Sequence, residues 1–254
     1  MAGISMHNFW KPPAAALGRA LAVLALILAA SSRAGACTVD DDLDVAAEGV
    51  LSSFDVAESR GATKSMSCKL LVPGPHLQVT TRRTATAAEV ARADAIRART
   101  RQALAKYQDY RVALQEGYEI RFSNLNLKRY HFSNRENARA SLQAFDPARP
   151  TSLLYEKDRG GYRLIGVMFT APRVASEAEL DRRFPISVAP WHLHTNFCLA
   201  YAKPSRRRAA PDPRFGPEGT IATAEECTAA GGTFKPVLFG WMTHVDLYDS
   251  DEKD

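Results

Sequence analysis

Two histidines in one short segment are the residues of this sequence best suited to chemistry. Residues 190–198 read Pro-Trp-His-Leu-His-Thr-Asn-Phe-Cys, so one residue separates His192 from His194. Alternate side chains of a β-strand point to the same face, which predicts both imidazoles on one face. The same alternation places Asn196 and Cys198 with them, and Trp191, Leu193, Thr195 and Phe197 on the opposite face. We therefore expect a polar site on one face of this strand.

A transition metal is the chemistry that these histidines favour. Neutral imidazole is a common protein ligand for Zn, Cu, Ni and Fe. His244 lies in a strand predicted over residues 237–248, and His131 in one predicted over 127–132. We expect Zn, Cu or Fe to be held by His192, His194 and His244, with His131 as a fourth ligand or as a hydrogen-bond donor to a ligand.

Glu156 is the candidate acid or base of such a site, and the alternative is a residue where a strand emerges into solvent. An H-x-H pair with a distant histidine is similar to the metal face of cupin barrels. In cupins a carboxylate usually follows the pair, whereas this chain has Cys198 near that place. An enzyme would need an open coordination position beside such an acid or base. A metal-handling protein would have a closed site, and the histidines leave both readings open.

The alternative class of function contains no metal. The histidines would then line the pocket of a ligand-binding module that is cross-linked by disulfides, or they would hydrogen-bond one another in a structural module. Convergence of the imidazole nitrogens favours the metal, whereas rings directed at backbone carbonyls favour the alternative.

The four cysteines are expected to form disulfides, because an even number in an exported chain is typical of them. We predict the pairs Cys37–Cys68 and Cys198–Cys227, since each closes a loop of about 30 residues. A cysteine in a disulfide cannot be a thiolate ligand.

The N-terminal residues 1–36 are predicted to be a signal peptide. Lys11 and Arg19 precede an apolar run over residues 20–30, which is too short to span a bilayer, and small residues stand before Cys37. We expect a periplasmic or secreted protein with no membrane span. A lipid anchor on Cys37 is the alternative.

Charge argues against nucleic acid as a partner. The formal net charge of the 254 residues is +5. Removing residues 1–36 takes away Lys11, Arg19 and Arg33 and no acidic residue, which leaves +2. The expected partner is a metal ion or an unidentified small molecule, and the basic face of the first helix is expected to be solvated.

The remaining chain predicts an α+β fold with a mostly antiparallel sheet, which a small cupin-like barrel would satisfy. We divide it into an extended segment over residues 37–85, a long helix over 86–117, an α+β domain with the histidine site over 118–248, and an acidic tail over 249–254. Capping boxes begin helices at Thr86 and Ser176, and Thr223 begins another. Residues 151–156 and 161–170 read as a hairpin around the turn at 157–160.

Several short motifs resemble a family of secreted bacterial proteins of undetermined activity. The motifs are Tyr-His-Phe-Ser-Asn at 130–134, Phe-Asp-Pro-Ala-Arg-Pro-Thr-Ser-Leu-Leu-Tyr-Glu at 145–156, Gly-Tyr-Arg-Leu-Ile-Gly-Val at 161–167 and Trp-His-Leu-His at 191–194. The resemblance covers about residues 109–248. It implies that the motifs belong to one domain and one site, and it brings no activity with it.

Overall fold

The computed structural model describes residues 71, 73–120, 127, 129–200, 212–216 and 219–248. The predicted signal peptide, the predicted Cys37–Cys68 disulfide and the acidic tail lie outside these residues, as does most of the segment 37–85.

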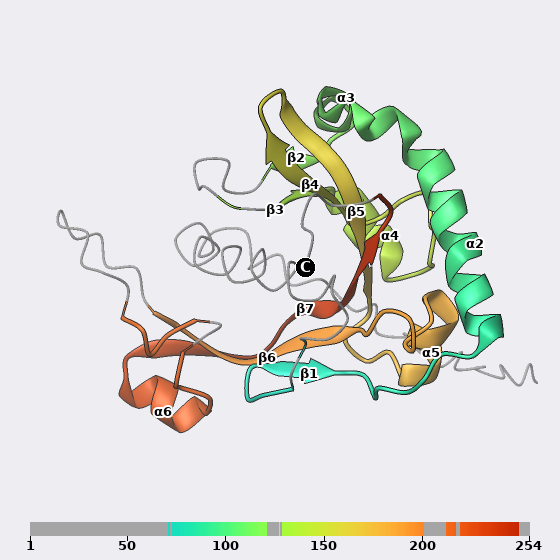
Figure 1. The fold of residues 1–254 in the computed structure, drawn as a ribbon. Coiled ribbons are helices and arrows are strands. Elements are labelled where there is room, and N and C mark those ends of the chain that lie inside the picture. The colour runs from blue at the N-terminus through green and yellow to red at the C-terminus, as the bar shows by residue number, and fades with distance from the viewer. Residues whose placement is uncertain are drawn as a thin grey trace, which may run out of the picture. The chain divides into compact units, whose positions relative to one another are not determined.

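Seven antiparallel strands form one sheet (Figure 1). They are β1 (Leu77–Val79), β2 (Glu119–Ile120), β3 (Arg129–Ser133), β4 (Ser152–Asp158), β5 (Gly161–Ala171), β6 (His192–Ala200) and β7 (Gly232–Asp246). Their order is β1-β6-β7-β5-β4-β3-β2, with every neighbouring pair antiparallel. The α+β prediction with an antiparallel sheet is confirmed. Among the described residues β1 and β2 are open edges, so the sheet is not closed into a barrel.

The helices are short except for the first. They are α2 (Ala87–Leu104), the 3₁₀ turn η2 (Ala105–Gln108), α3 (Tyr110–Gln115), α4 (Arg135–Ser141), α5 (Glu177–Arg183) and α6 (Ala224–Ala229). Within the described ranges, no helix is long and apolar enough to cross a membrane.

The predicted helix starts are confirmed because they depend on local hydrogen bonds. Thr86 and Glu89 form a capping box before α2, and Ser176 and Glu179 form another before α5. The side chain of Thr223 accepts a hydrogen bond from the Glu226 amide before α6. The hairpin is also as predicted, with Asp158 opposite Gly161 at the turn.

The prediction of one helix over residues 86–117 is wrong. The helix ends at Leu104, passes through η2 and restarts at Tyr110. Asp109 has an extended backbone, with φ −88° and ψ 104°, and its carboxylate accepts from the Arg111 amide as the N-cap of α3. Leu104 and Ala113, on the two sides of the break, are buried, whereas Val90 and Leu114 are exposed.

One face of the sheet carries the main core. Tyr130, Phe132, Leu153, Val167 and Trp191 pack in one cluster with side chains from α2, η2, α3 and α5. Figure 1 shows α2 running along this side of the strands. The side chains on the other face form the candidate site.

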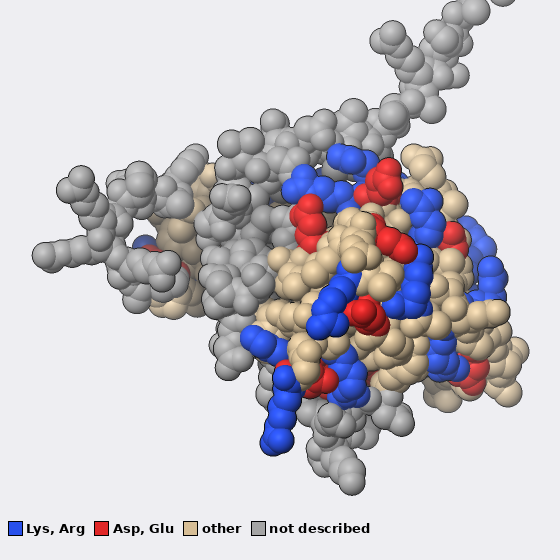
Figure 2. Space-filling model, turned by 90° about the horizontal axis from the view of Figure 1, so that it is seen from above, with Lys and Arg blue, Asp and Glu red and all other residues tan. Residues whose placement is uncertain are grey.

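Some basic side chains of α2 and η2 form ion pairs with neighbouring carboxylates. Arg92 donates to the Asp181 carboxylate at 2.7 Å, and Lys106 pairs with Glu116 at 2.7 Å. Figure 2 shows basic and acidic side chains interspersed on the face seen from above. This supports solvation of the helix face over a single-sign binding surface.

Candidate metal centre

Four histidines form a row across the sheet, on the face opposite the main core. His131 comes from β3, His244 from β7, and His192 and His194 from β6. Successive ring centroids lie 5.4 Å apart for His131–His244, 5.3 Å for His244–His192 and 5.3 Å for His192–His194. The structure thus brings all four predicted ligands together from three strands.

The closest ring nitrogens belong to His131 and His244. Their Nε2 atoms are 3.3 Å apart. Two imidazole nitrogens that bind one tetrahedral zinc at about 2.0–2.1 Å are separated by roughly 3.3–3.4 Å. This pair therefore has the spacing of two ligands to a single ion.

Strand register explains why residues so far apart in the chain meet. His244 lies opposite Met168 of β5, and His192 lies opposite Met242 of β7. His131 lies opposite Leu154 of β4. Cross-strand neighbours on one face have Cβ atoms about 4.5–5.5 Å apart, so the histidines and these apolar side chains form one layer.

A bulge in β7 changes the strand register beside His192 and His194. The step from Met242 to Leu238 on β7 faces the shorter step from His192 to His194 on β6, so β7 holds two more residues here. Phe239 has a φ of +63°, which a bulky residue rarely adopts. A Cβ on Gly240 would overlap the Ala171 carbonyl oxygen, so only glycine fits. Bulges often occur next to functional sites, where they change the direction of a side chain.

Burial keeps the four imidazoles neutral. Desolvation lowers the pKa of His131 and of His194 to about 4. It also places the pKa values of His192 and His244 well below the usual range, and repulsion from the neighbouring imidazoles acts in the same direction. The neutral ring is the form that binds metal.

The histidine rings differ from a structural histidine in the same domain. His76 is buried, and its Nε2 is 2.8 Å from the Gly219 carbonyl oxygen. By contrast, the Nδ1 atoms of His131 and His192 are buried without a hydrogen-bond partner in the described part of the chain. A buried polar atom without a partner costs free energy and calls for an explanation.

The predicted alternation of β6 holds only as far as His194. Asn196 has a φ of +58°, which shifts the strand out of its regular alternation. As a result the Phe197 ring lies 5.8 Å from the His194 ring and packs with Leu238, away from the Trp191 side of the core. Asparagine tolerates this backbone better than most residues, and its Nδ2 donates to the Pro75 carbonyl at 2.9 Å.

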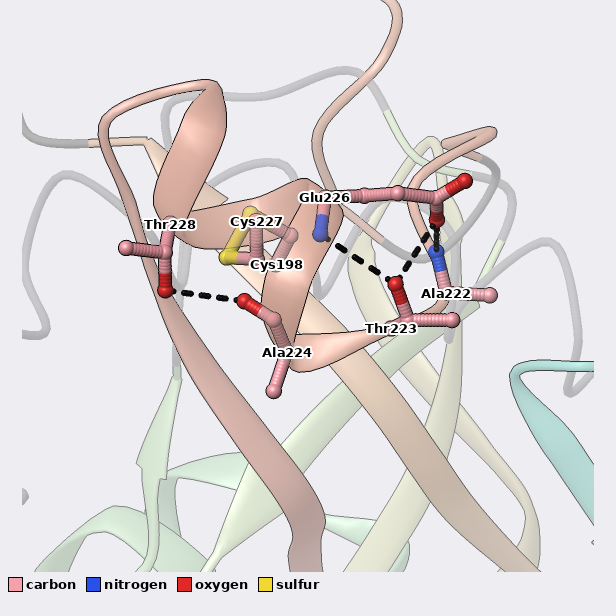
Figure 3. The surroundings of a disulfide bond; sticks show 7 residues. All are labelled: Cys198, Ala222, Thr223, Ala224, Glu226, Cys227 and Thr228. Atoms are coloured by element: carbon pink, nitrogen blue, oxygen red, sulfur yellow. Dashed lines mark hydrogen bonds between the residues drawn. A yellow bond between two sulfur atoms is a disulfide. The ribbon is translucent and has the colours of Figure 1, made fainter.

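Cys198 is tied in a disulfide with Cys227, as predicted. Figure 3 shows the bond joining β6 to α6, next to the Thr223 cap. Both cysteines lie in a separate small cluster with Ile221. The disulfide removes both sulfurs from the set of thiolate ligands.

Glu156 lies in an ion-pair cluster of β3, β4 and β5. Its carboxylate is 2.8 Å from Arg163 Nη2 and 3.5 Å from Arg129 Nε. Register places both arginines directly across from it on the neighbouring strands. These contacts give the carboxylate a structural use as an ion-pair partner.

Asp246 is a second carboxylate near the row, two residues beyond His244 on β7. Its Oδ1 atom is buried without a hydrogen-bond partner among the described residues. Burial raises its pKa to about 6, against the opposing charge of Arg129. Alternation over the predicted strand 237–248 places Asp246 on the His244 face, but no role was predicted for it. Its two-residue spacing from His244 was the available signal.

Other residues in or beside the quoted motifs have structural roles. Asn134 caps α4. Asn137, which follows the first motif in α4, donates to the Tyr118 hydroxyl and to the Pro150 carbonyl, at 2.9 and 3.1 Å. The Asp146 carboxylate accepts from the Ala148 amide at the turn before β4. The motifs therefore build the frame of the sheet, and only their histidines enter the row.

Across the described ranges, no group of three or more His, Cys, Asp or Glu side chains stands in an arrangement that could hold a metal ion. The short ring separations are those between successive members of the row. The imidazoles thus offer close pairs, and a third ligand has to come from a small side-chain movement or from another residue type.

Comparison with known proteins gives no relative from which a function could be transferred. No family model, no curated protein and no solved structure matches the chain.

Proposed function

We propose that this chain is an exported metalloprotein whose transition-metal site is the histidine row of His131, His192, His194 and His244. The observation that carries the proposal is the 3.3 Å separation of the His131 and His244 Nε2 atoms. A direct hydrogen bond between neutral imidazoles would account for this separation, and so would a shared ion. The unpartnered Nδ1 atoms of His131 and His192 in the described chain favour a ligand role for the row.

The proposal rests on the row of side chains and not on a cupin fold. Open edges at β1 and β2 among the described residues set this sheet apart from a barrel. What it has in common with the cupin metal face is an H-x-H pair beside a histidine from a strand that is distant in sequence. The carboxylate that cupins add has its nearest counterpart here in Asp246, which lies on the same strand as His244.

Export and the resemblance to secreted bacterial proteins are part of the same proposal. The Cys198–Cys227 disulfide is compatible with an oxidising compartment. The predicted signal peptide would deliver the chain there, free or anchored through Cys37. The proposal includes an enzyme and a metal-handling protein, which differ in whether a coordination position is open to water or substrate.

The second candidate is a module without metal, in which the four histidines only satisfy one another. It is favoured by the lack, in the described residues, of a ready group of three ligands. Elemental analysis separates the two candidates.

The test compares metal content of the mature chain, purified from an exporting host without a polyhistidine tag. The variants are His131→Ala/His244→Ala and the control His76→Gln, which alters a buried histidine that is bound to backbone carbonyls. We expect about one transition-metal ion per chain in the wild type and in the control, and a loss in the double variant. Circular dichroism and the intact disulfide show whether each variant is folded.

No bound metal in the folded wild type, even after incubation with Zn(II), Fe(II) and copper, would overturn the proposal. Metal retained in the double variant would move the site away from this row.

A further inference from the structure

Two buried methionines share the layer of the histidine row. Met168 lies directly opposite His244, and Met242 lies directly opposite His192. Both pack in a small cluster with Leu154 and Ile165, separate from the main core. Each of two histidines therefore has a thioether as its cross-strand neighbour, within about 4.5–5.5 Å between Cβ atoms.

Apart from the Asp246 carboxylate, two residues beyond His244 on β7, the donors of this layer carry no negative charge. Imidazole and thioether are neutral ligands, and the cysteines of the domain's disulfide cannot supply thiolate. The Glu156 carboxylate is paired with Arg163 and Arg129. The electrostatic cost of burying an ion rises with the square of its charge, so a divalent ion costs roughly four times as much as a monovalent ion of equal size. A buried neutral ligand set therefore favours a monovalent metal.

The number and type of the donors also favour a monovalent metal. Thioethers are soft ligands that select Cu(I) over Zn(II), Fe(II) and other harder ions. Cu(I) is also stable with fewer ligands than the four that structural zinc requires. An imidazole pair and a neighbouring thioether meet this need where a full set of His, Cys, Asp or Glu ligands is lacking in the described residues.

We propose that the site binds Cu(I), with the thioethers of Met168 and Met242 as ligands beside the histidines. This inference rests on the proposed metal site and names its metal. It assigns a binding role to two residues whose alternative role is to fill the apolar layer. No change of oxidation state is involved.

The test measures Cu(I) affinity by anaerobic competition with a chromogenic Cu(I) chelator. Ascorbate serves as the reductant because it leaves the disulfide intact. The variants are Met168→Leu, Met242→Leu and the pair together, which keep side-chain volume nearly constant. Ile165→Leu is the matched control, since it alters the same apolar cluster and removes no sulfur. Zn(II) affinity is measured on each protein in parallel.

We expect the double methionine variant to bind Cu(I) at least about tenfold more weakly, while its Zn(II) affinity and the Cu(I) affinity of Ile165→Leu stay within about twofold of wild type. X-ray absorption of the copper-loaded wild type should show sulfur as well as nitrogen neighbours. This second measurement needs no variant to fold.

Three outcomes are distinguishable from this result. Tight Zn(II) binding with no Cu(I) preference would overturn the copper inference and leave the metal site standing. Unchanged Cu(I) affinity in the double variant, with only nitrogen around copper, would also overturn it. Failure of the wild type to bind either ion would overturn the metal site itself.

Discussion

The same strands make both faces of the sheet, but the buried polar atoms on the two faces differ in whether they have hydrogen-bond partners. On the helix-covered face, the Tyr155 hydroxyl donates to the Tyr107 carbonyl at 2.7 Å, and the Trp191 indole donates to the Phe184 carbonyl at 3.2 Å. On the histidine face, His131 Nδ1, His192 Nδ1 and Asp246 Oδ1 have no partner in the described chain. The first face is organised for stability. The second holds polar atoms at a cost, as expected of a binding site.

Acid should unfold the metal-free protein through the histidine face, and this is the largest effect we expect. The pKa of His131 is about 4 in the fold and about 6.5 in an unfolded chain, so only the unfolded state takes up a proton between these values. Its contribution to stability is constant above pH 6.5 and falls by about 2–3 kcal/mol as the pH drops to 4. The other three histidines act with the same sign. Asp246, whose pKa is raised, acts in the opposite direction.

Denaturant titrations of the chelator-treated protein at pH 7.5, 6, 5 and 4.5 measure this dependence. A free energy of unfolding that stays constant over this range would mean that the imidazoles are solvated and that the two faces do not differ as described.

Removing the largest buried ring of the helix-covered face should lower stability at every pH. Trp191 is fully buried in the main core. We expect Trp191→Ala to reduce the free energy of unfolding by about 3–5 kcal/mol, because it leaves a cavity and an unpaired carbonyl. Chemical denaturation at pH 7.5 measures the loss. Val174→Ala is the control, because Val174 is 82% exposed and its loss should change stability by less than about 0.5 kcal/mol.

His131→Leu should have a small effect at neutral pH and sharpen the contrast between the faces. The exchange removes a buried Nδ1 that has no partner in the described chain, together with the Nε2 contact to His244, and places an apolar side chain opposite Leu154. We expect the metal-free variant to differ from wild type by less than about 1.5 kcal/mol at pH 7.5. At pH 5 it should be the more stable of the two, because the unfolded variant has one proton fewer to bind.

The same denaturation series measures both values. A loss of about 3 kcal/mol or more at pH 7.5 would show that His131 supports the core as Trp191 does, and that the histidine face is structural.

Features set by neighbours in sequence could be predicted here, and features set by register could not. The caps at Thr86 and Ser176 depend on residues three positions away, and both formed as expected. The Cys198–Cys227 pair also followed from spacing. The pairing of Met168 with His244 depends on how β5 aligns with β7, about 75 residues apart in sequence. No local pattern contains that alignment.

Individual backbone conformations account for most of the remaining differences. The helix over residues 86–117 failed at Asp109, whose side chain caps a new helix in place of continuing the old one. The alternation of β6 failed at Asn196, where one residue with positive φ moved Phe197 to the His194 side. The four histidines and the strands that carry them could be predicted from the sequence, because alternation holds over short stretches. Alternation also places Met242 and Asp246 on the His244 face, whereas Met168 joins this layer only through the pairing of β5 with β7.

The position of β7 has a consequence for when the site can form. It is the last described strand in chain order, yet it lies between β6 and β5 near the middle of the sheet (Figure 1). The β6 strand with its H-x-H pair has no place beside β5 until β7 arrives with His244. A chain threaded across a membrane from its N-terminus would therefore complete the row only after His244 had emerged. If the protein is exported as proposed, the complete site forms only after translocation. It would then bind metal ions present outside the cytosol and not cytosolic ones.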